Sequence, residues 1–156
     1  MKIRQAIIIP LVVIAPIILA WKSIVTVHAG REHNLTIGME EGATDGFDID
    51  IDKPAPPPPP IGFYCFFSLS DTNYAFIDGL WGDIRPHSDS ASWELVTRNQ
   101  EQPAKISVSE LPPDGELFID DIRIDSAGAV IELPAKDEPI SIIYRKTEAE
   151  EPANSE

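Results

Sequence analysis

The sequence predicts an all-β protein, an antiparallel immunoglobulin-like β-sandwich preceded by a signal or anchor helix and a polyproline spacer. From residue 61 onward, short apolar or alternating runs repeat at short intervals, separated by Gly, Pro, Asp, Asn and Ser. No window keeps a helical period over three turns. About six to eight short strands at this spacing are typical of two antiparallel sheets packed face to face.

The N-terminus has the features of an export signal. Two basic residues precede an apolar block, residues 6–20, and Val27 and Ala29 place small side chains where a signal peptidase reads them. These features predict a signal peptide over residues 1–29 and a secreted or cell-surface protein. The alternative is an uncleaved membrane anchor, although the block is shorter than the roughly 20 apolar residues of a membrane-spanning helix.

The charge excludes several classes of partner. The chain carries a net charge of −14, and cleavage after Ala29 would leave 9 basic and 26 acidic residues, or −17. Nucleic-acid backbones and anionic lipid surfaces attract arranged Lys and Arg, which this composition does not provide. We therefore expect no nucleic-acid partner, and contact with a membrane only through an uncleaved N-terminal segment.

Residues 30–60 are expected to form an N-terminal strand, an acidic motif and a proline-rich lead-in. Leu35, Ile37 and Met39 alternate with polar or small residues, the period of a half-buried strand. Asn34 begins an Asn-Leu-Thr sequon and is a candidate glycosylation site. Residues 54–60 read PAPPPPP, which favours an extended polyproline II spacer.

The acidic motif has two interpretations. In the first, residues 47–51 form a strand whose Phe47, Ile49 and Ile51 face inward while its aspartates face water. In the second, the chain curls into a calcium site. The candidate calcium ligands are Asp45, Asp48 and Asp52.

The calcium interpretation does not follow the EF-hand pattern. Counting from Asp48, the sixth and twelfth positions hold Lys53 and Pro59, where an EF-hand needs Gly and Glu. Carboxylates two residues apart on one strand face lie about 7 Å apart, too far to share an ion. We therefore expect a solvated strand or turn with no cofactor, and keep calcium as the alternative.

Residues 61–146 are expected to form the β-sandwich, and residues 147–156 an acidic, disordered tail. In the run ELFIDDIRI the apolar phase switches across Asp120 and Asp121, which predicts a bulge or a corner there. The residues expected in the core occupy the apolar phase of their strands. They are Trp93, Leu95, Ile106, Val108, Ile122, Ile140, Ile142 and Tyr144.

The remaining candidates for chemistry are few. The single Cys65 lies in an aromatic run and is expected to be buried and inert. Trp81 lies in a glycine-rich segment where a sugar could stack on its ring. The histidines, expected to be exposed, stand in no nucleophile or metal-ligand spacing. They are His28, His33 and His87.

The stretch LTIGMEEGATDGFDIDIDKPAPPPPP, followed by DIRP, SWELV and LPPDGELFIDD, resembles a recurrent module of secreted bacterial and archaeal surface proteins. That module joins an ATDGFD…D…P-x-PP opening to an immunoglobulin-like or fibronectin-like β-sandwich, often as an accessory domain of larger exported proteins. The resemblance spans residues 35–144. It implies a fold and an extracellular location, and it implies no catalytic residue.

The expected function is therefore that of a noncatalytic secreted or cell-envelope module with a structural or adhesive role. Its expected partners are envelope or extracellular proteins, or surface polymers. The alternative is a calcium- or carbohydrate-binding module. A hydrolase is the third possibility, because abundant carboxylates alone do not make a catalytic pair.

Overall fold

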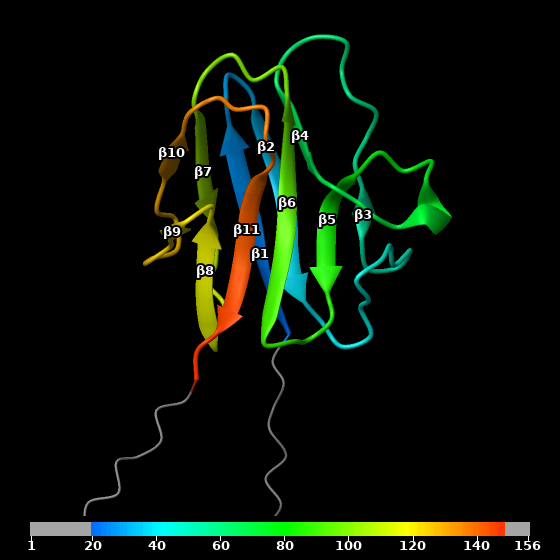
Figure 1. Cartoon of the computed structure of the whole chain (residues 1–156), viewed down its shortest axis with the longest axis vertical. Coiled ribbons are helices and arrows are strands. Elements are labelled where there is room, and N and C mark those ends of the chain that lie inside the picture. Colours follow the sequence, from blue (N-terminus) through cyan, green and yellow to red (C-terminus); the bar gives the residue numbers. More distant parts are fainter. Residues whose placement is uncertain (1–19, 149–156) are drawn as a thin grey trace, which may run out of the picture.

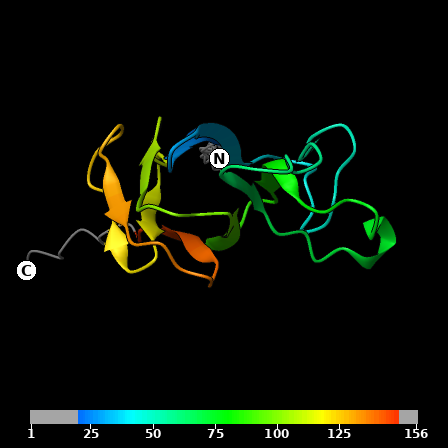
Figure 2. The same cartoon turned by 90° about the horizontal axis from the view of Figure 1, so that it is seen from above.

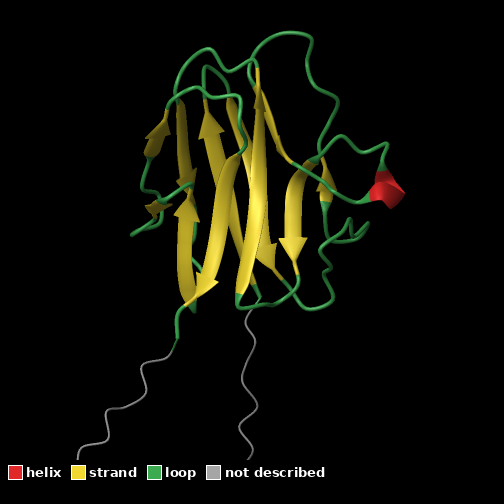
Figure 3. Ribbon diagram, in the orientation of Figure 1, coloured by secondary structure: helices red, strands yellow, loops and turns green. Residues whose placement is uncertain are grey.

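The computed structural model describes residues 20–148, which form an all-β fold whose only helix in that range is a single 3-10 turn, η1 (Thr72–Tyr74) (Figures 1 and 3). The strands are β1 (Trp21–His28), β2 (Glu32–Met39), β3 (Lys53–Pro54), β4 (Tyr64–Phe67), β5 (Leu80–Arg85), β6 (Ser90–Arg98), β7 (Ala104–Val108), β8 (Gly115–Ile119), β9 (Ile122–Arg123), β10 (Ile131–Leu133) and β11 (Ile140–Lys146).

All eleven strands belong to one curled, mixed sheet. Its order is β10-β7-β1-β2-β5-β4-β6-β11-β8-β9, and β3 pairs with β5 beside this path. Every pair is antiparallel except β2 and β5, which run parallel from Thr36 and Gly82 onward. The prediction of a purely antiparallel arrangement is therefore wrong at this pair. The chain between β2 and β5 contains the acidic motif and the proline segment, long enough to return the chain for parallel pairing.

The sheet turns sharply where β4 meets β5. A single residue pair, Phe67 with Leu80, joins these two strands, so the halves on either side can fold toward each other (Figures 1 and 2). Trp21 of β1 lies 6.3 Å from Trp93 of β6 and 6.2 Å from Tyr144 of β11, measured between ring centroids. These rings connect the two halves through a continuous apolar core.

Seven of the eight residues predicted to lie in the core are buried. Ile122 is the exception, with 45% of its surface exposed. It belongs to β9, the outermost strand, which is joined to β8 by the two-residue turn Asp120–Asp121. Asp120 has a φ of 49°, so the switch of apolar phase marks a tight hairpin rather than a bulge or a corner between sheets.

Residues 21–28, which the sequence assigned to the leader, form strand β1. This strand lies between β2 and β7 and pairs with both. Val25 and Val27 are fully buried, and the exposed positions alternate with the buried ones. The domain boundary at residue 29 is therefore corrected: the folded unit already includes Trp21. Residues 1–19, with the rest of the predicted leader, and residues 149–156 of the predicted tail lie outside the described residues.

The membrane-anchor alternative rests on the same N-terminal segment. No helix within residues 20–148 has the length and apolar character needed to cross a bilayer. The first and last described residues lie at the same end of the domain, whereas the segment after β3 rises to the opposite end (Figure 1).

Of the two forms expected for residues 47–51, a solvated strand or a turn, the structure has no strand there and a turn over residues 49–51. Ile49 is 75% exposed and Asp52 is buried, the reverse of the expected pattern. The reason is that backbone amides from two parts of the chain reach the Asp52 carboxylate, which draws it inward. Only Lys53 and Pro54 of the following segment pair with β5, and the prolines from Pro56 to Pro60 run along the surface.

Candidate functional site

The acidic motif is a loop that closes on itself through Asp48. The carboxylate of Asp48 accepts a hydrogen bond from the Thr44 amide at 2.6 Å and from the Thr44 hydroxyl at 3.0 Å. The hydroxyl of Thr44 in turn accepts a bond from the Gly46 amide at 3.2 Å. Short Asp and Thr side chains bond readily to nearby backbone amides, which favours turns over strands. The alternating aspartates are thus part of a turn.

Asp52 fastens this loop to strand β5. Its two oxygens accept hydrogen bonds from the Asp48 amide at 2.8 Å and from the Ile84 amide at 2.9 Å. Only 8% of the Asp52 surface is exposed. Burial raises the pKa of this carboxyl above its ordinary value, although the two amide hydrogen bonds oppose the rise.

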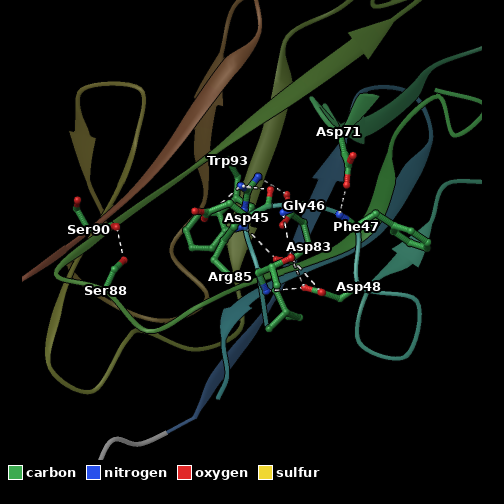
Figure 4. A network of polar contacts seen from close by, with 12 residues as sticks. Asp45, Gly46, Phe47, Asp48, Asp71, Asp83, Arg85, Ser88, Ser90 and Trp93 are labelled. Atoms are coloured by element: carbon green, nitrogen blue, oxygen red, sulfur yellow. Dashed lines mark hydrogen bonds and ion pairs between the residues drawn. The ribbon is translucent and has the colours of Figure 1, made fainter. Parts of the chain in front are cut away.

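Asp71 holds the opposite side of the same loop. Its carboxylate accepts hydrogen bonds from the Phe47 amide at 3.2 Å and from the Asn73 amide at 2.9 Å, where it caps η1 (Figure 4). The bonds from Asn73 and then Phe47 lower the pKa of Asp71, because they stabilise the charged form. The Phe47 ring packs edge-on against Tyr74, with 4.9 Å between centroids.

An ion pair between a buried carboxylate and a half-buried guanidinium lies beneath the loop, at the end of β5. The Arg85 guanidinium donates to Asp83 at 2.7 Å and to the Asp45 carbonyl at 3.1 Å (Figure 4). Asp83 is only 1% exposed. Burial raises the pKa of Asp83 to about 6, an effect that outweighs the attraction of Arg85. The backbone carbonyl of Asp83 also accepts a bond from the Trp93 indole at 3.0 Å, which ties this site to the core.

The three predicted calcium ligands do not converge. Asp45 faces Arg85, with 3.8 Å between its carboxylate and the guanidinium. The carboxylates of Asp48 and Asp52 instead accept hydrogen bonds from backbone amides. Within residues 20–148 no three His, Cys, Asp or Glu side chains are grouped so as to hold a metal ion. The calcium alternative stays a prediction, and any ion would have to compete with these amides for the carboxylate oxygens.

Trp81, the candidate for sugar stacking, is partly enclosed by its neighbours, and the carbohydrate alternative stays a prediction. It lies on β5, half-buried, and its indole N–H donates to the Cys65 carbonyl at 3.0 Å. Its ring lies 5.7 Å from the His33 ring and 6.3 Å from the Tyr64 ring, and Lys53 sits 5.8 Å from its centroid. The glycine-rich neighbourhood therefore belongs to a strand, and Gly82 accommodates the close approach of β3.

The cysteine and histidine predictions have different outcomes. Cys65 is fully buried, as predicted, and burial raises the pKa of its thiol to about 12, which leaves it protonated. His33, expected to be exposed, is buried on β2 with its Nε2 atom 3.1 Å from the Phe63 carbonyl. His28 lies exposed on β1.

Asn34 lies exposed on β2. Its side-chain oxygen accepts a hydrogen bond from the Thr26 hydroxyl at 2.8 Å. The glycosylation assignment stays a prediction.

The comparisons with known proteins give no independent assignment: no family model, curated protein or solved structure matches the chain. The candidate site is therefore the acidic loop together with the contacts that hold it against β5 and η1. Sequence reasoning missed Asp71, Asp83 and Arg85, which take part in it. The sequence offers only a weak signal for Asp71. The Phe47 amide, which donates a hydrogen bond to Asp71, is 24 residues away, so this contact depends on the topology.

Proposed function

We propose that this chain is a noncatalytic, exported or cell-surface module with a structural or adhesive role, and that its curled sheet is an immunoglobulin-like sandwich. The two halves of the sheet pack face to face through Trp21, Trp93 and Tyr144, which supports the sandwich assignment. The partners are envelope or extracellular proteins, or surface polymers.

The observation that carries this proposal is that the acidic side chains hold the loops in place. Asp48, Asp52 and Asp71, the residues that look most like a site, accept hydrogen bonds from backbone amides and so hold loops rigidly. A module that presents fixed loops on a stable sheet is suited to binding other molecules.

The position of β1 changes the proposed processing of the leader. Cleavage after Ala29 would remove a strand that pairs on both sides, so we place any cleavage before Trp21. The alternative of an uncleaved anchor is compatible with this boundary.

The proposal is tested by the location and the N-terminus of the protein in a cell that exports it. A C-terminal epitope tag should be accessible to protease added to intact cells, and the intact mass should place the N-terminus before Trp21. A tag confined to the cytosol would contradict export. Hydrolysis of a surface polysaccharide by the purified protein would contradict the noncatalytic assignment.

A further inference from the structure

An open hollow of about 370 Å³, which we call the sheet hollow, lies beside strands β6 and β11. Sites for small ligands commonly have volumes of about 300 to 1,000 Å³. One wall is formed by neighbours on the two strands, because Ser92 pairs with Ile143 and Ser90 pairs with Arg145. Residues paired across two strands share one face of the sheet. The register therefore places two hydroxyls and a guanidinium side by side in this wall.

The opposite wall comes from the end of β5 and from the acidic loop, through Arg85 and Asp45. Asp83 pairs with the Arg85 guanidinium at 2.7 Å, so this arginine adds little net charge to the sheet hollow. The Asp45 side chain is 82% exposed, and its carboxylate lies 3.8 Å from Arg85, beyond hydrogen-bond distance. The carboxylate oxygens of Asp45 can therefore accept hydrogen bonds from a ligand.

Arg145 is a positive charge of the sheet hollow that lacks an acidic partner. No ion pair among residues 20–148 includes it. Glu116, opposite it on β8, pairs instead with Arg123 at 2.8 Å. The Arg145 guanidinium lies over the Phe118 ring, 5.0 Å from its centroid, and this contact orients its plane. Because Arg145 is also exposed, its N–H groups can bind a ligand carboxylate through two parallel hydrogen bonds.

The other side chains of the sheet hollow suit hydroxyl groups. The exposed hydroxyls of Ser90 and Ser92 can each donate and accept hydrogen bonds, and the Asp45 carboxylate can accept them. Ile143, half-buried, adds an apolar contact next to Ser92. A second carboxylate placed near Asp45 would meet like charge, which is unfavourable. The sheet hollow therefore fits a compact ligand with one carboxylate and several hydroxyls, as an acidic sugar has.

A peptide with a free carboxylate shares part of this chemistry but fits less well. Peptides commonly bind sheets by adding a strand to an exposed edge. Beside the sheet hollow that edge is short, because β4 pairs with β6 only from Leu95 onward. Alternate residues of β6 direct their backbone groups to β11, and the Ser88 hydroxyl already donates to the Ser90 carbonyl. An added strand would therefore find few backbone groups to pair with.

We propose that the sheet hollow binds an acidic sugar, a uronic acid unit of an anionic polysaccharide. Its carboxylate binds Arg145, and its hydroxyls bind the two serines and Asp45. The net charge of −14 does not prevent this, because charges more than about 8 Å away are largely screened at physiological salt. This inference rests on the proposed function, which includes surface polymers among the partners, and adds the class of polymer and its site.

The test measures binding by calorimetry at about 0.15 M salt, where distant charges are screened. The full chain is held in nanodiscs of net-neutral phosphatidylcholine, with empty nanodiscs as the blank. The acidic probes are trimers of galacturonic, glucuronic and mannuronic acid. Their controls are the neutral trimers of galactose, glucose and mannose, and a triglutamate peptide with blocked ends, which matches the charge of the acidic trimers.

The variants are Arg145→Gln, which removes the charge, and Arg145→Lys, which keeps the charge but not the planar fork of N–H groups. The matched control is Arg98→Gln. Arg98 is also exposed, on β6, and its guanidinium lies over the Phe66 ring at the same 5.0 Å, but it does not line the sheet hollow. Thermal unfolding of each variant checks that it remains folded.

We expect at least one acidic trimer to bind about tenfold more tightly than its neutral counterpart and than triglutamate, a difference of about 1.4 kcal/mol. Arg145→Gln should remove most of this preference and Arg145→Lys should reduce it, whereas Arg98→Gln should leave it unchanged. The proposal would be overturned if no acidic trimer is preferred, or if the preference survives Arg145→Gln.

Two other results would also overturn it. Triglutamate binding as tightly as the acidic trimers would indicate a peptide ligand or charge alone, and an equal loss in Arg98→Gln would indicate a general effect of surface charge. None of these results bears on export of the protein, which the protease and intact-mass experiment measures separately.

Discussion

Strand β1 and the acidic loop are held in the fold by different interactions. Strand β1 pairs on both sides and buries Val25 and Val27 completely. The acidic loop leaves Ile49 75% exposed and is fastened by carboxylates that accept backbone amides, chiefly those of Asp48 and Asp52. The first region depends on apolar burial, which is insensitive to pH, and the second on groups that titrate. The two regions should therefore respond to different perturbations.

The largest expected effect is the removal of β1. A chain that begins at Gly30 should lose cooperative unfolding, because β2 and β7 would both lose a paired neighbour and the core would lose Val25 and Val27. A chain that begins at Ala20 should unfold cooperatively. Circular dichroism against temperature distinguishes the two, and a cooperative transition from the shorter chain would show that β1 is dispensable.

Substitution within the core should cost less than deletion of a strand. Ile142→Ala is expected to lower the free energy of unfolding by about 2 to 5 kcal/mol, because this side chain is fully buried between β6 and β8. The matched control is Ile122→Ala, at a site that is 45% exposed, where the loss should be well under half as large. Urea denaturation measures both values. Equal losses would mean that burial does not determine the cost.

The buried carboxyl of Asp83 should make stability depend on pH. Its pKa rises from 3.8 to about 6 on folding, so the folded protein binds the proton more tightly. This tighter proton binding adds to the free energy of unfolding below about pH 4. The added stability, up to about 3 kcal/mol, is lost as the pH rises through about 6. The charges of Arg85, Asp52 and Asp45 also influence the pKa of Asp83. The pH dependence of the wild type is therefore compared with that of a variant that changes Asp83 alone.

Asp83→Asn keeps an oxygen that can accept from Arg85 but does not titrate. Its free energy of unfolding, relative to that of the wild type, should therefore increase between pH 4 and pH 7. Denaturant titrations at several pH values give this difference. A constant difference would show that Asp83 has an ordinary pKa in the folded protein.

Release of the loop should have a smaller, local effect. Asp52→Ala leaves the amides of Ile84 and Asp48 without their acceptor, at a cost of about 1 to 3 kcal/mol for a buried group. Asp50→Ala, at an exposed position, is the control and should change the free energy of unfolding little. Denaturation of the two variants tests this, and equal stability would mean that solvent replaces the missing acceptor.

The smallest expected effect is that of calcium. If the acidic motif is only a hydrogen-bonded turn, a chelator should leave the melting temperature unchanged. A structural site at 100 times its dissociation constant would instead add about 2.7 kcal/mol, a shift of several degrees. A decrease of that size on chelation, abolished by Asp48→Asn, would establish the calcium alternative.

The sequence was informative wherever apolar residues alternate over a strand. Trp93, Leu95 and Ile142 were placed correctly because burial follows the period of two. The same period was present in residues 21–28, but the adjacent apolar block and the small residues near Ala29 favoured a leader. A local pattern cannot distinguish a cleaved segment from a central strand when both are short and apolar.

The acidic motif could not be predicted from its pattern alone. Phe47, Ile49 and Ile51 alternate with aspartates, which is typical of a strand, yet the amides of Thr44 and Ile84 determine where Asp48 and Asp52 point. Ile84 is 32 residues away from Asp52, so this partner depends on the pairing of β3, which begins at Lys53, with β5.

Native-state hydrogen exchange tests most directly the claim that β1 belongs to the core and that the loop is separately fastened. The amides of Val25 and Val27 should exchange among the slowest, through global unfolding, and those of Thr44 and Asp48 faster. Asp52→Ala should speed exchange of the most protected amides only as far as it lowers global stability. The loop amides should exchange faster by more than that amount. Exchange at Val25 and Val27 as fast as in the loop would contradict the account, because β1 would then not be an integral strand of the domain.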